Sequence, residues 1–158
     1  METDIQEIQL ACFRLGEATF AADIMRIKEI IRPQKLTKLP KAPAFVEGVI
    51  NLRGMVIPVI DLRKRFELPE RVALEEARLL VVGVSRQLVG LVVDDVTEVV
   101  TVQAGDIKPP PHSIEGVSVE YLIGVCLVRD TLVMLVNLDR ILTSREASAI
   151  AGLAGTGR

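Results

Sequence analysis

Residues 45–66 read FVEGVINLRGMVIPVIDLRKRF, and this stretch decides the fold class. Two runs rich in β-branched residues, 49–52 and 55–60, flank the pair Arg53-Gly54. Apolar runs of this length on both sides of a two-residue turn predict an antiparallel β-hairpin. Asp61 follows the second run and can cap one helical turn over residues 62–66. The stretch therefore predicts a strand, a tight turn, a second strand and a short helix.

The same alternation of short apolar runs with glycine, proline or charged residues continues in both directions. Upstream, residues 8–15 and 18–22 predict a second hairpin, and residues 24–31 predict one helical turn that leads into a strand. Downstream, further strands are predicted at 78–84, 88–93, 96–102, 121–128 and 131–138. Ser144 is suited to cap a terminal helix that runs to about Leu153. We therefore expect an all-β fold with short helices and a C-terminal helix.

The chain contains a concealed duplication. Residues 48–62 align with the stretch that starts at Gly124, at an offset of 76 residues, and glycine, valine, arginine and leucine recur at matching positions. Residues 14–23 align with 85–94 at an offset of 71 residues, and both segments end in aspartate. Chance similarity among valine-rich strands is the alternative, but the shared order of the features favours duplication.

Duplication predicts two similar β-barrels of about five strands each, packed against one another. A barrel removes exposed sheet edges, and pairing two barrels enlarges a core that about 75 residues would leave marginal. We expect residues 1–158 to form a single domain, with one subdomain over residues 14–70 and the other over 78–138. Residues 8–13 and the helix 144–153 are expected to pack on the barrels.

Composition argues against nucleic acids as partners and against direct insertion into a membrane. The net charge is −2, and the chain has no Trp, one Tyr and four Phe, too few for a base-stacking platform. Apolar residues make up 49% and the mean hydropathy is +0.38. Even so, no apolar run approaches the roughly 18 residues that a membrane span needs. The acidic start, residues 1–4, lacks the pattern of a signal peptide, so we expect a cytoplasmic protein.

No residue set has a catalytic or metal-binding pattern: phosphate loops and the GxSxG, HExxH and CxxC motifs are all absent. Cys12 and Cys126 lie in apolar runs and are predicted to be buried thiols. His112 lies in a proline-rich stretch and is predicted to be exposed. Asp94 and Asp95 would point to opposite faces of a strand and are predicted to form its solvated end. We expect no enzymatic activity, no cofactor and no metal.

Four segments resemble the CheW chemotaxis coupling proteins: 20–32, 45–66, 88–100 and 121–138. The resemblance spans roughly residues 8–145, and its most specific part is the NLRG and IPV sequence within 45–66. One departure is Asp95, because the family commonly has glycine at this position of a VVDGV motif. This puts a close backbone approach at that turn in doubt.

The resemblance implies a fold of two packed SH3-like five-stranded barrels. It also implies a non-enzymatic adaptor that couples chemoreceptors to the CheA histidine kinase. One barrel would dock on the regulatory domain of the kinase, and a groove between the barrels would receive the cytoplasmic tip of a receptor. The adaptor would be cytoplasmic and recruited to membrane receptor arrays.

Motif matching to the family also implies the positions that bind partners. They are Ile27, Glu29, Gly48, Arg53, Gly54, Met55 and Val56. Glu29 and Arg53 could form an ion pair that fixes the shape of the contact surface. The glycines would hold turns of that surface, and core packing is an equal alternative for Met55 and Val56.

Three rival functions share some of these features. The same adaptor could serve a parallel chemosensory pathway that controls pili, development or gene expression, and the sequence does not separate these pathways. A CheV-type protein would need an attached receiver domain, for which the residues after the last predicted strand are too few. An SH3-like module that binds proline-rich peptides would need an aromatic groove, which five scattered aromatic residues do not offer.

Overall fold

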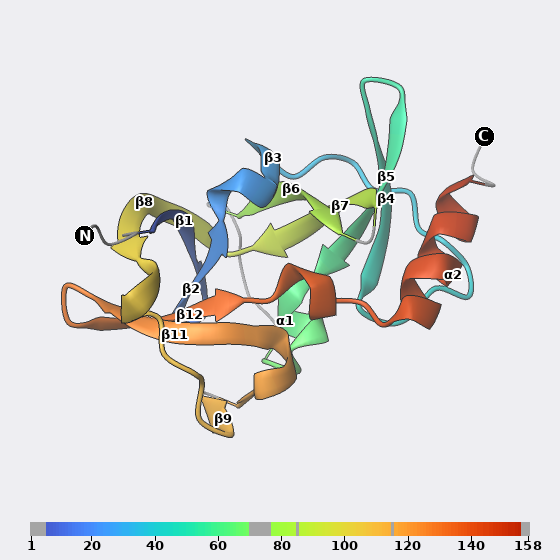
Figure 1. Ribbon diagram of the computed structural model, residues 1–158. Helices are drawn as coiled ribbons and strands as arrows, with labels where there is room; N and C mark the ends of the chain where they lie inside the picture. The colour runs from blue at the N-terminus through green and yellow to red at the C-terminus, as the bar shows by residue number, and fades with distance from the viewer. Residues whose placement is uncertain (1–5, 70–76, 85, 115, 156–158) are drawn as a thin grey trace.

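Two five-stranded sheets form the body of the fold, and Figure 1 shows them in a computed structural model that describes residues 6–69, 77–84, 86–114 and 116–155. Sheet A contains, in hydrogen-bonded order, β11 (Leu122–Val128), β12 (Thr131–Val136), β2 (Ala18–Asp23), β1 (Glu7–Leu15) and β8 (Asp95–Gln103). Sheet B contains β3 (Ile27–Ile31), β6 (Arg78–Val84), β7 (Gln87–Val93), β5 (Met55–Asp61) and β4 (Val46–Leu52). The prediction of a mostly β fold is confirmed.

Short elements connect and cover the sheets. They are the single turns η1 (Ile24–Arg26), η2 (Ala104–Asp106), η3 (Val119–Tyr121) and η4 (Leu138–Arg140), the small hairpin of β9 (Ser113–Ile114) and β10 (Val117–Ser118), and the helices α1 (Leu62–Arg65) and α2 (Ser144–Gly155). The side chain of Asp61 accepts a hydrogen bond from the Arg63 backbone N–H and caps α1, as predicted. At α2 the cap lies one residue before the predicted Ser144. Thr143 and Glu146 each accept a hydrogen bond from the other's backbone N–H.

The two halves of the chain exchange their first hairpins. The β1–β2 hairpin belongs to the first half but pairs with β8 and, in parallel, with β12 of the second half. Reciprocally, the β6–β7 hairpin pairs with β3 and β5 of the first half. The strand pairing therefore does not follow the predicted division at residues 70–78. Similar hairpins carry no sequence signal for which half they join, and the chain crosses between sheets at η1 and again at Asp94.

The predicted duplication is confirmed in atomic detail. β4 and β11 begin and end 76 residues apart, and each has a register shift at its glycine, Gly48 or Gly124. The turns that follow have positive φ at both residues, Arg53-Gly54 in one copy and Arg129-Asp130 in the other. Equal irregularities at equal positions are not a general property of valine-rich strands, so chance similarity does not explain them.

The sheets are not closed barrels, in contrast to the prediction. Among the described strands, no ladder joins β3 to β4 in sheet B or β8 to β11 in sheet A. Instead, the segment that precedes each hairpin covers its edge through one bridge, Thr37 with Val49 and Lys108 with Val125. Each bridge has two backbone hydrogen bonds of 2.8–2.9 Å. In a closed barrel, the edge strand of each sheet would pair with the strand at the other end of the sheet. Here a connecting segment covers that edge instead.

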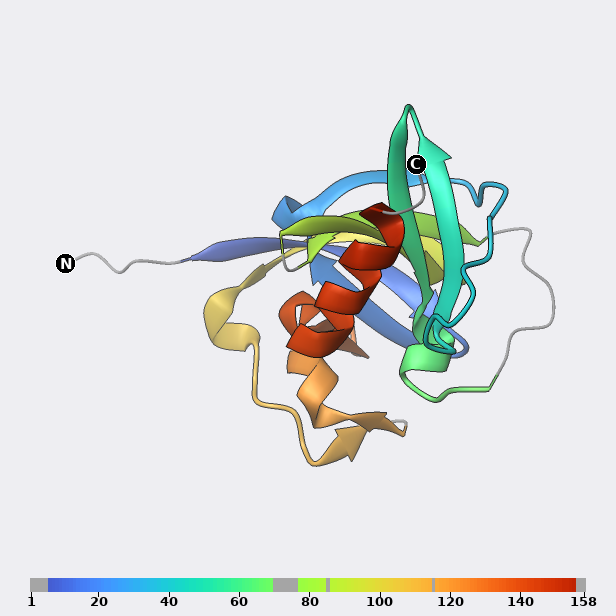
Figure 2. The same cartoon turned by 90° about the vertical axis from the view of Figure 1, so that its right-hand side faces the viewer.

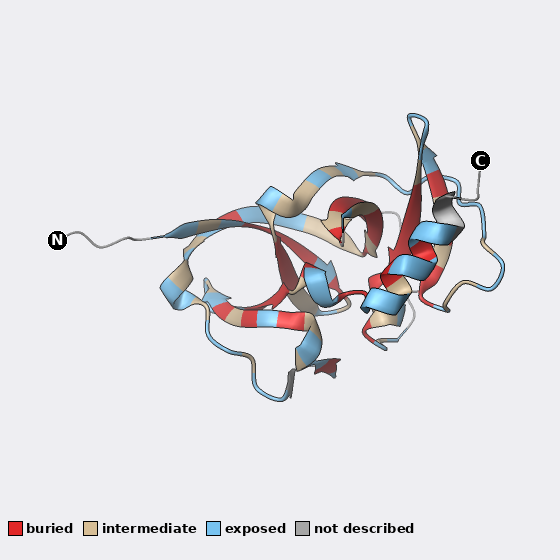
Figure 3. Cartoon of the chain, turned by 45° about the vertical axis from the view of Figure 1, so that its right-hand side comes forward, coloured by how far each residue is buried: buried red, intermediate tan, exposed pale blue. Residues whose placement is uncertain are grey.

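One hydrophobic core is shared by both sheets (Figure 3). Phe13 and Phe20 of sheet A stack with centroids 5.9 Å apart, Phe66 packs on Phe20 at 5.7 Å, and Tyr121 packs on Phe66 at 5.1 Å. Each buried aromatic side chain of this kind contributes about 1.5–3 kcal/mol. Because residues of both sheets meet in this cluster, neither sheet has a complete core of its own.

Each sheet also has a smaller cluster of buried residues. The cluster in sheet A includes Cys12 and Cys126, which are buried free thiols, as predicted. Burial is the main cause that raises the pKa of Cys12 to about 11, and Glu98 adds to the effect. Such a thiol is a poor nucleophile near neutral pH.

Candidate protein-docking site

The hairpin of β4 and β5 projects beyond the rest of the molecule (Figure 2). Arg53 and Gly54 form its two-residue tip, with φ of 51° and 88°. Positive φ at both positions is the geometry that matches the twist of a hairpin, and glycine adopts it without strain. The Gly54 backbone N–H also donates to Asn51 Oδ1 at 2.8 Å. The NLRG sequence therefore builds a tight, hydrogen-bonded tip that displays Arg53.

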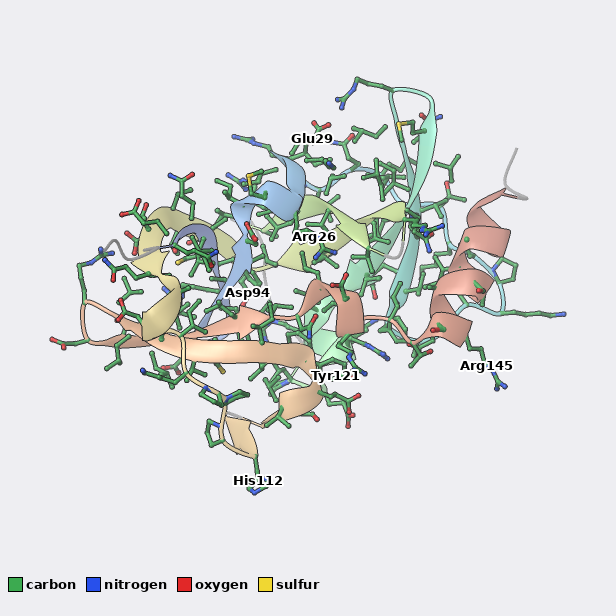
Figure 4. The ribbon with its side chains drawn as sticks, in the orientation of Figure 1. Arg26, Glu29, Asp94, His112, Tyr121 and Arg145 are labelled. Atoms are coloured by element: carbon green, nitrogen blue, oxygen red, sulfur yellow. The ribbon has the colours of Figure 1, made fainter. Side chains whose placement is uncertain are left out.

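Glu29 forms an ion pair with Arg53. Glu29 lies on β3 and Arg53 follows β4, and these strands are at opposite ends of sheet B. The pair therefore requires the sheet to curl until its two ends meet, and Figure 4 shows Glu29 on the β3 side of the projecting hairpin, below its tip. The side chains are 69% exposed for Arg53 and 32% for Glu29. An exposed pair contributes less than about 1 kcal/mol, so its main effect is on the shape of the surface.

The other predicted positions lie at different depths around this pair. Met55 follows the tip and is 52% exposed. Val56 is half-buried, and Ile27 packs partly against the shared core. Gly48 is buried in β4, beneath the segment that contains Thr37. The surface around the tip therefore contains Glu29, Arg53, Gly54 and Met55. Gly48 is buried beneath this surface, where it contacts the Thr37 segment.

A second ion pair of the same kind joins Arg129 to Glu98. Arg129 lies at the tip between β11 and β12, and Glu98 lies on β8 at the opposite end of sheet A. Sheet A is therefore curled in the same way as sheet B. The sequence carried the signal for this pair, because Arg129 aligns with Arg53 and Glu98 with Glu29 in the duplication. Only the structure showed that the two residues of each copy meet.

Asp94 is not a solvated strand end, in contrast to the prediction. Its carboxylate accepts a hydrogen bond from the Gly16 backbone N–H at 2.7 Å and two from the Arg63 guanidinium. Arg63 also donates to the Pro69 carbonyl oxygen at 2.6 Å. The Arg63 and Asp94 side chains are only 12% and 17% exposed, and the bonds to Asp94 raise the pKa of Arg63 further above its ordinary value. Asp94 thus ties α1 to the β1–β2 turn where the sheets meet.

We expect Asp94→Asn to lower the free energy of unfolding by about 2 kcal/mol, because it leaves the largely buried guanidinium of Arg63 without its counter-charge. Urea denaturation measures the loss. Asp95→Asn is the matched control, because Asp95 has no ion pair within the described residues, and it should change stability by under about 0.5 kcal/mol. Equal stability of the two variants would show that the bonds of Asp94 do not hold the sheets together.

The described residues offer no side-chain cluster suited to metal binding. Among them, no group of three or more His, Cys, Asp or Glu side chains could hold a metal ion. His112 lies exposed on a connecting segment, as predicted, far from Asp94 in the view of Figure 4. Within the same residues, no helix combines the length and the apolar character needed to cross a bilayer.

Comparisons with known proteins agree with this description. A family model described as "CheW-like domain" matches residues 9–146. The chain is similar to "Chemotaxis protein CheW" of Treponema pallidum, with 34% identity over 97% of this chain and 92% of that protein. It is also similar to "Protein FrzA" of Myxococcus xanthus, with 30% identity over 92% and 91% of the two chains. Among solved structures, it resembles the scaffolding protein TtCheW from Thermoanaerobacter tengcongensis, with 32% identity, a TM-score of 0.82, and coverage of 89% of this chain and 91% of that chain.

Proposed function

Because this chain belongs to the CheW-like family, we propose that it is a non-enzymatic adaptor that couples chemoreceptors to a CheA-type histidine kinase. The observation that carries the proposal is the hairpin tip at Arg53. There an ion pair between the two ends of a curled sheet adjoins the exposed apolar residue Met55, two positions after Arg53 in the chain. Such a surface is suited to docking, since apolar contact supplies affinity and the charged groups fix the register.

We infer that each sheet is an SH3-like barrel whose end strands are joined by side chains and not by a backbone ladder. The Glu29–Arg53 and Glu98–Arg129 pairs support this, because each one links strands from opposite ends of its sheet. The two barrels act as one domain, since they exchange hairpins and share a core.

The proposed contact site consists of the positions that match the family motif, with the buried Gly48 as a support beneath its surface. They are Ile27, Glu29, Gly48, Arg53, Gly54, Met55 and Val56. The regulatory domain of the kinase and the cytoplasmic tip of a receptor are the proposed partners, and recruitment of a cytoplasmic adaptor to receptor arrays follows from them. The similarity to Protein FrzA, which has a name different from that of the other relatives, favours a parallel chemosensory pathway as the second candidate.

We expect Arg53→Ala and Glu29→Ala each to weaken capture of the kinase regulatory domain or of a receptor-tip fragment by about tenfold. The melting temperature should fall by less than about 3 °C, because an exposed ion pair contributes little to stability. Pull-down with purified fragments and a thermal melt measure the two effects. Arg129→Ala is the matched control, because it removes the equivalent pair from sheet A, and it should leave capture unchanged. Full capture by both Arg53→Ala and Glu29→Ala would remove the tip from the proposed surface.

A further inference from the structure

The two copies of the duplicated unit have equivalent connections with different charges. One connection leads from β3 to β4 and passes the projecting hairpin (Figure 1), and the other follows β8. Each is fixed to its hairpin by a backbone bridge, at Thr37 or at Lys108. Each bridge also requires a glycine below it: a Cβ on Gly48 would lie 2.4 Å from the Thr37 carbonyl oxygen, and one on Gly124 would lie 2.6 Å from that of Lys108. The fold therefore fixes each segment to its hairpin at the equivalent point.

The charges on these segments do not follow the duplication. Residues 32–44 contain four basic residues and no acidic residue, whereas residues 103–112 contain Asp106, Lys108 and the single histidine. Lys28 on β3 extends the basic series. We define the basic arc as the side chains of Lys28, Arg32, Lys35, Lys38 and Lys41.

All five side chains of the basic arc are exposed, and none has a carboxylate partner among the described residues. The one acidic residue within residues 24–44 is Glu29, which is paired with Arg53. Five like charges along one exposed path repel each other and do not stabilise the fold. Since the second copy forms the equivalent bridge without a basic series of this kind, we infer that the charges serve something outside the chain.

The surroundings of the basic arc favour an acidic protein surface as the partner. Ile30 and Leu36, which lie between its basic residues, are exposed, and the exposed Met55 belongs to the neighbouring tip. Nucleic-acid binding without base readout relies on exposed aromatic residues, but the four Phe side chains are buried and Tyr121 packs on Phe66. The connection contains no helix, so it has no amphipathic face to lie on a membrane.

We propose that the basic arc binds an acidic, partly apolar face of the kinase regulatory domain, next to the contact at Arg53, and selects that partner by charge. This inference rests on the proposed adaptor function. Charges at the edge of an interface mainly raise the association rate and discriminate against partners with the wrong charge, and salt screens both effects. The arc would thereby let one adaptor distinguish kinases whose apolar contacts are alike.

The test compares Lys35→Glu/Lys38→Glu, on either side of the fixed Thr37, with Arg140→Glu/Arg145→Glu. Both double variants change the net charge equally, and both control residues are exposed; Figure 4 shows Arg145 on the outer side of α2. Titration of the full chain with the regulatory domain of the kinase from the same organism gives the affinity. We expect the arc variant to bind about tenfold more weakly at about 50 mM salt, with most of the difference gone at about 300 mM, and the control within about twofold of the unaltered chain.

Each other outcome has a distinct meaning. Equal losses in the two variants would overturn the inference, because only net charge would matter, and so would no loss in either. Loss of binding to phosphatidylglycerol vesicles or to a single-stranded oligonucleotide, with kinase affinity retained, would assign the arc to a different partner and overturn it. If the unaltered chain did not bind the kinase domain even at low salt, the adaptor proposal itself would fail.

Discussion

Replacing Gly48 with alanine should lower the free energy of unfolding by about 3 kcal/mol or more and the melting temperature by roughly 6–12 °C. Gly48 has a φ of 147°, which L-residues rarely adopt, and its Cβ would lie 2.4 Å from the Thr37 carbonyl oxygen and 3.0 Å from the carbonyl carbon. The obstacle is backbone, so rotation of a side chain does not relieve it. The segment around Thr37 must move, and its two hydrogen bonds to Val49 are lost.

A thermal melt and hydrogen exchange at the Thr37 and Val49 amides measure this effect, and both amides should exchange faster in the variant. Gly105→Ala is the matched control, because a Cβ at Gly105 meets nothing within 4 Å and the residue is exposed. If Gly48→Ala melted like Gly105→Ala, the connection would not be fixed by close packing. Its basic residues would then lack the defined path on which their proposed role depends.

The local structure was largely predictable because strands and tight turns are determined by neighbouring residues. The predicted strand at 121–128 coincides closely with β11, and the Arg53-Gly54 turn lies where the sequence placed it. Asp61 was also predictable as a helix cap, since a cap needs only the residues that follow it.

Features that depend on distant residues were not predictable in this way. Asp94 bonds to Arg63, 31 residues before it, and to Gly16, 78 residues before it, so its own segment indicated only a charged strand end. The Glu29–Arg53 pair could be proposed only as a hypothesis, since its residues are 24 positions apart and on strands that do not pair. The duplication was visible in the sequence. Because the two halves contain similar strands, each first hairpin could pair equally well with strands of its own half, so the sequence offered no reason to expect an exchange of hairpins.

The exchange of hairpins has a direct consequence for a divided chain. We expect the fragments 1–72 and 73–158 to be unfolded or self-associated when separate, and to form an equimolar complex with the amide NMR spectrum of the intact chain when mixed. Each fragment alone has strands from both sheets but completes neither, because β1 pairs with β8 and β6 with β3. Each fragment also lacks part of the shared core. A chain of about 75 residues buries too little apolar surface to remain folded after such a loss.

A change within one fragment can show that the complex uses the native strand pairing. Ala11 on β1 is 1% exposed and lies opposite Val99 of β8. Ala11→Asp in the fragment 1–72 should abolish association, because it buries an unpaired charge at the junction between the halves. Two separately folded, monomeric fragments would instead match the division at residues 70–78 expected from the sequence. The exchange of hairpins would then not hold the two halves together. The adaptor would instead consist of two independently folded barrels joined by a linker.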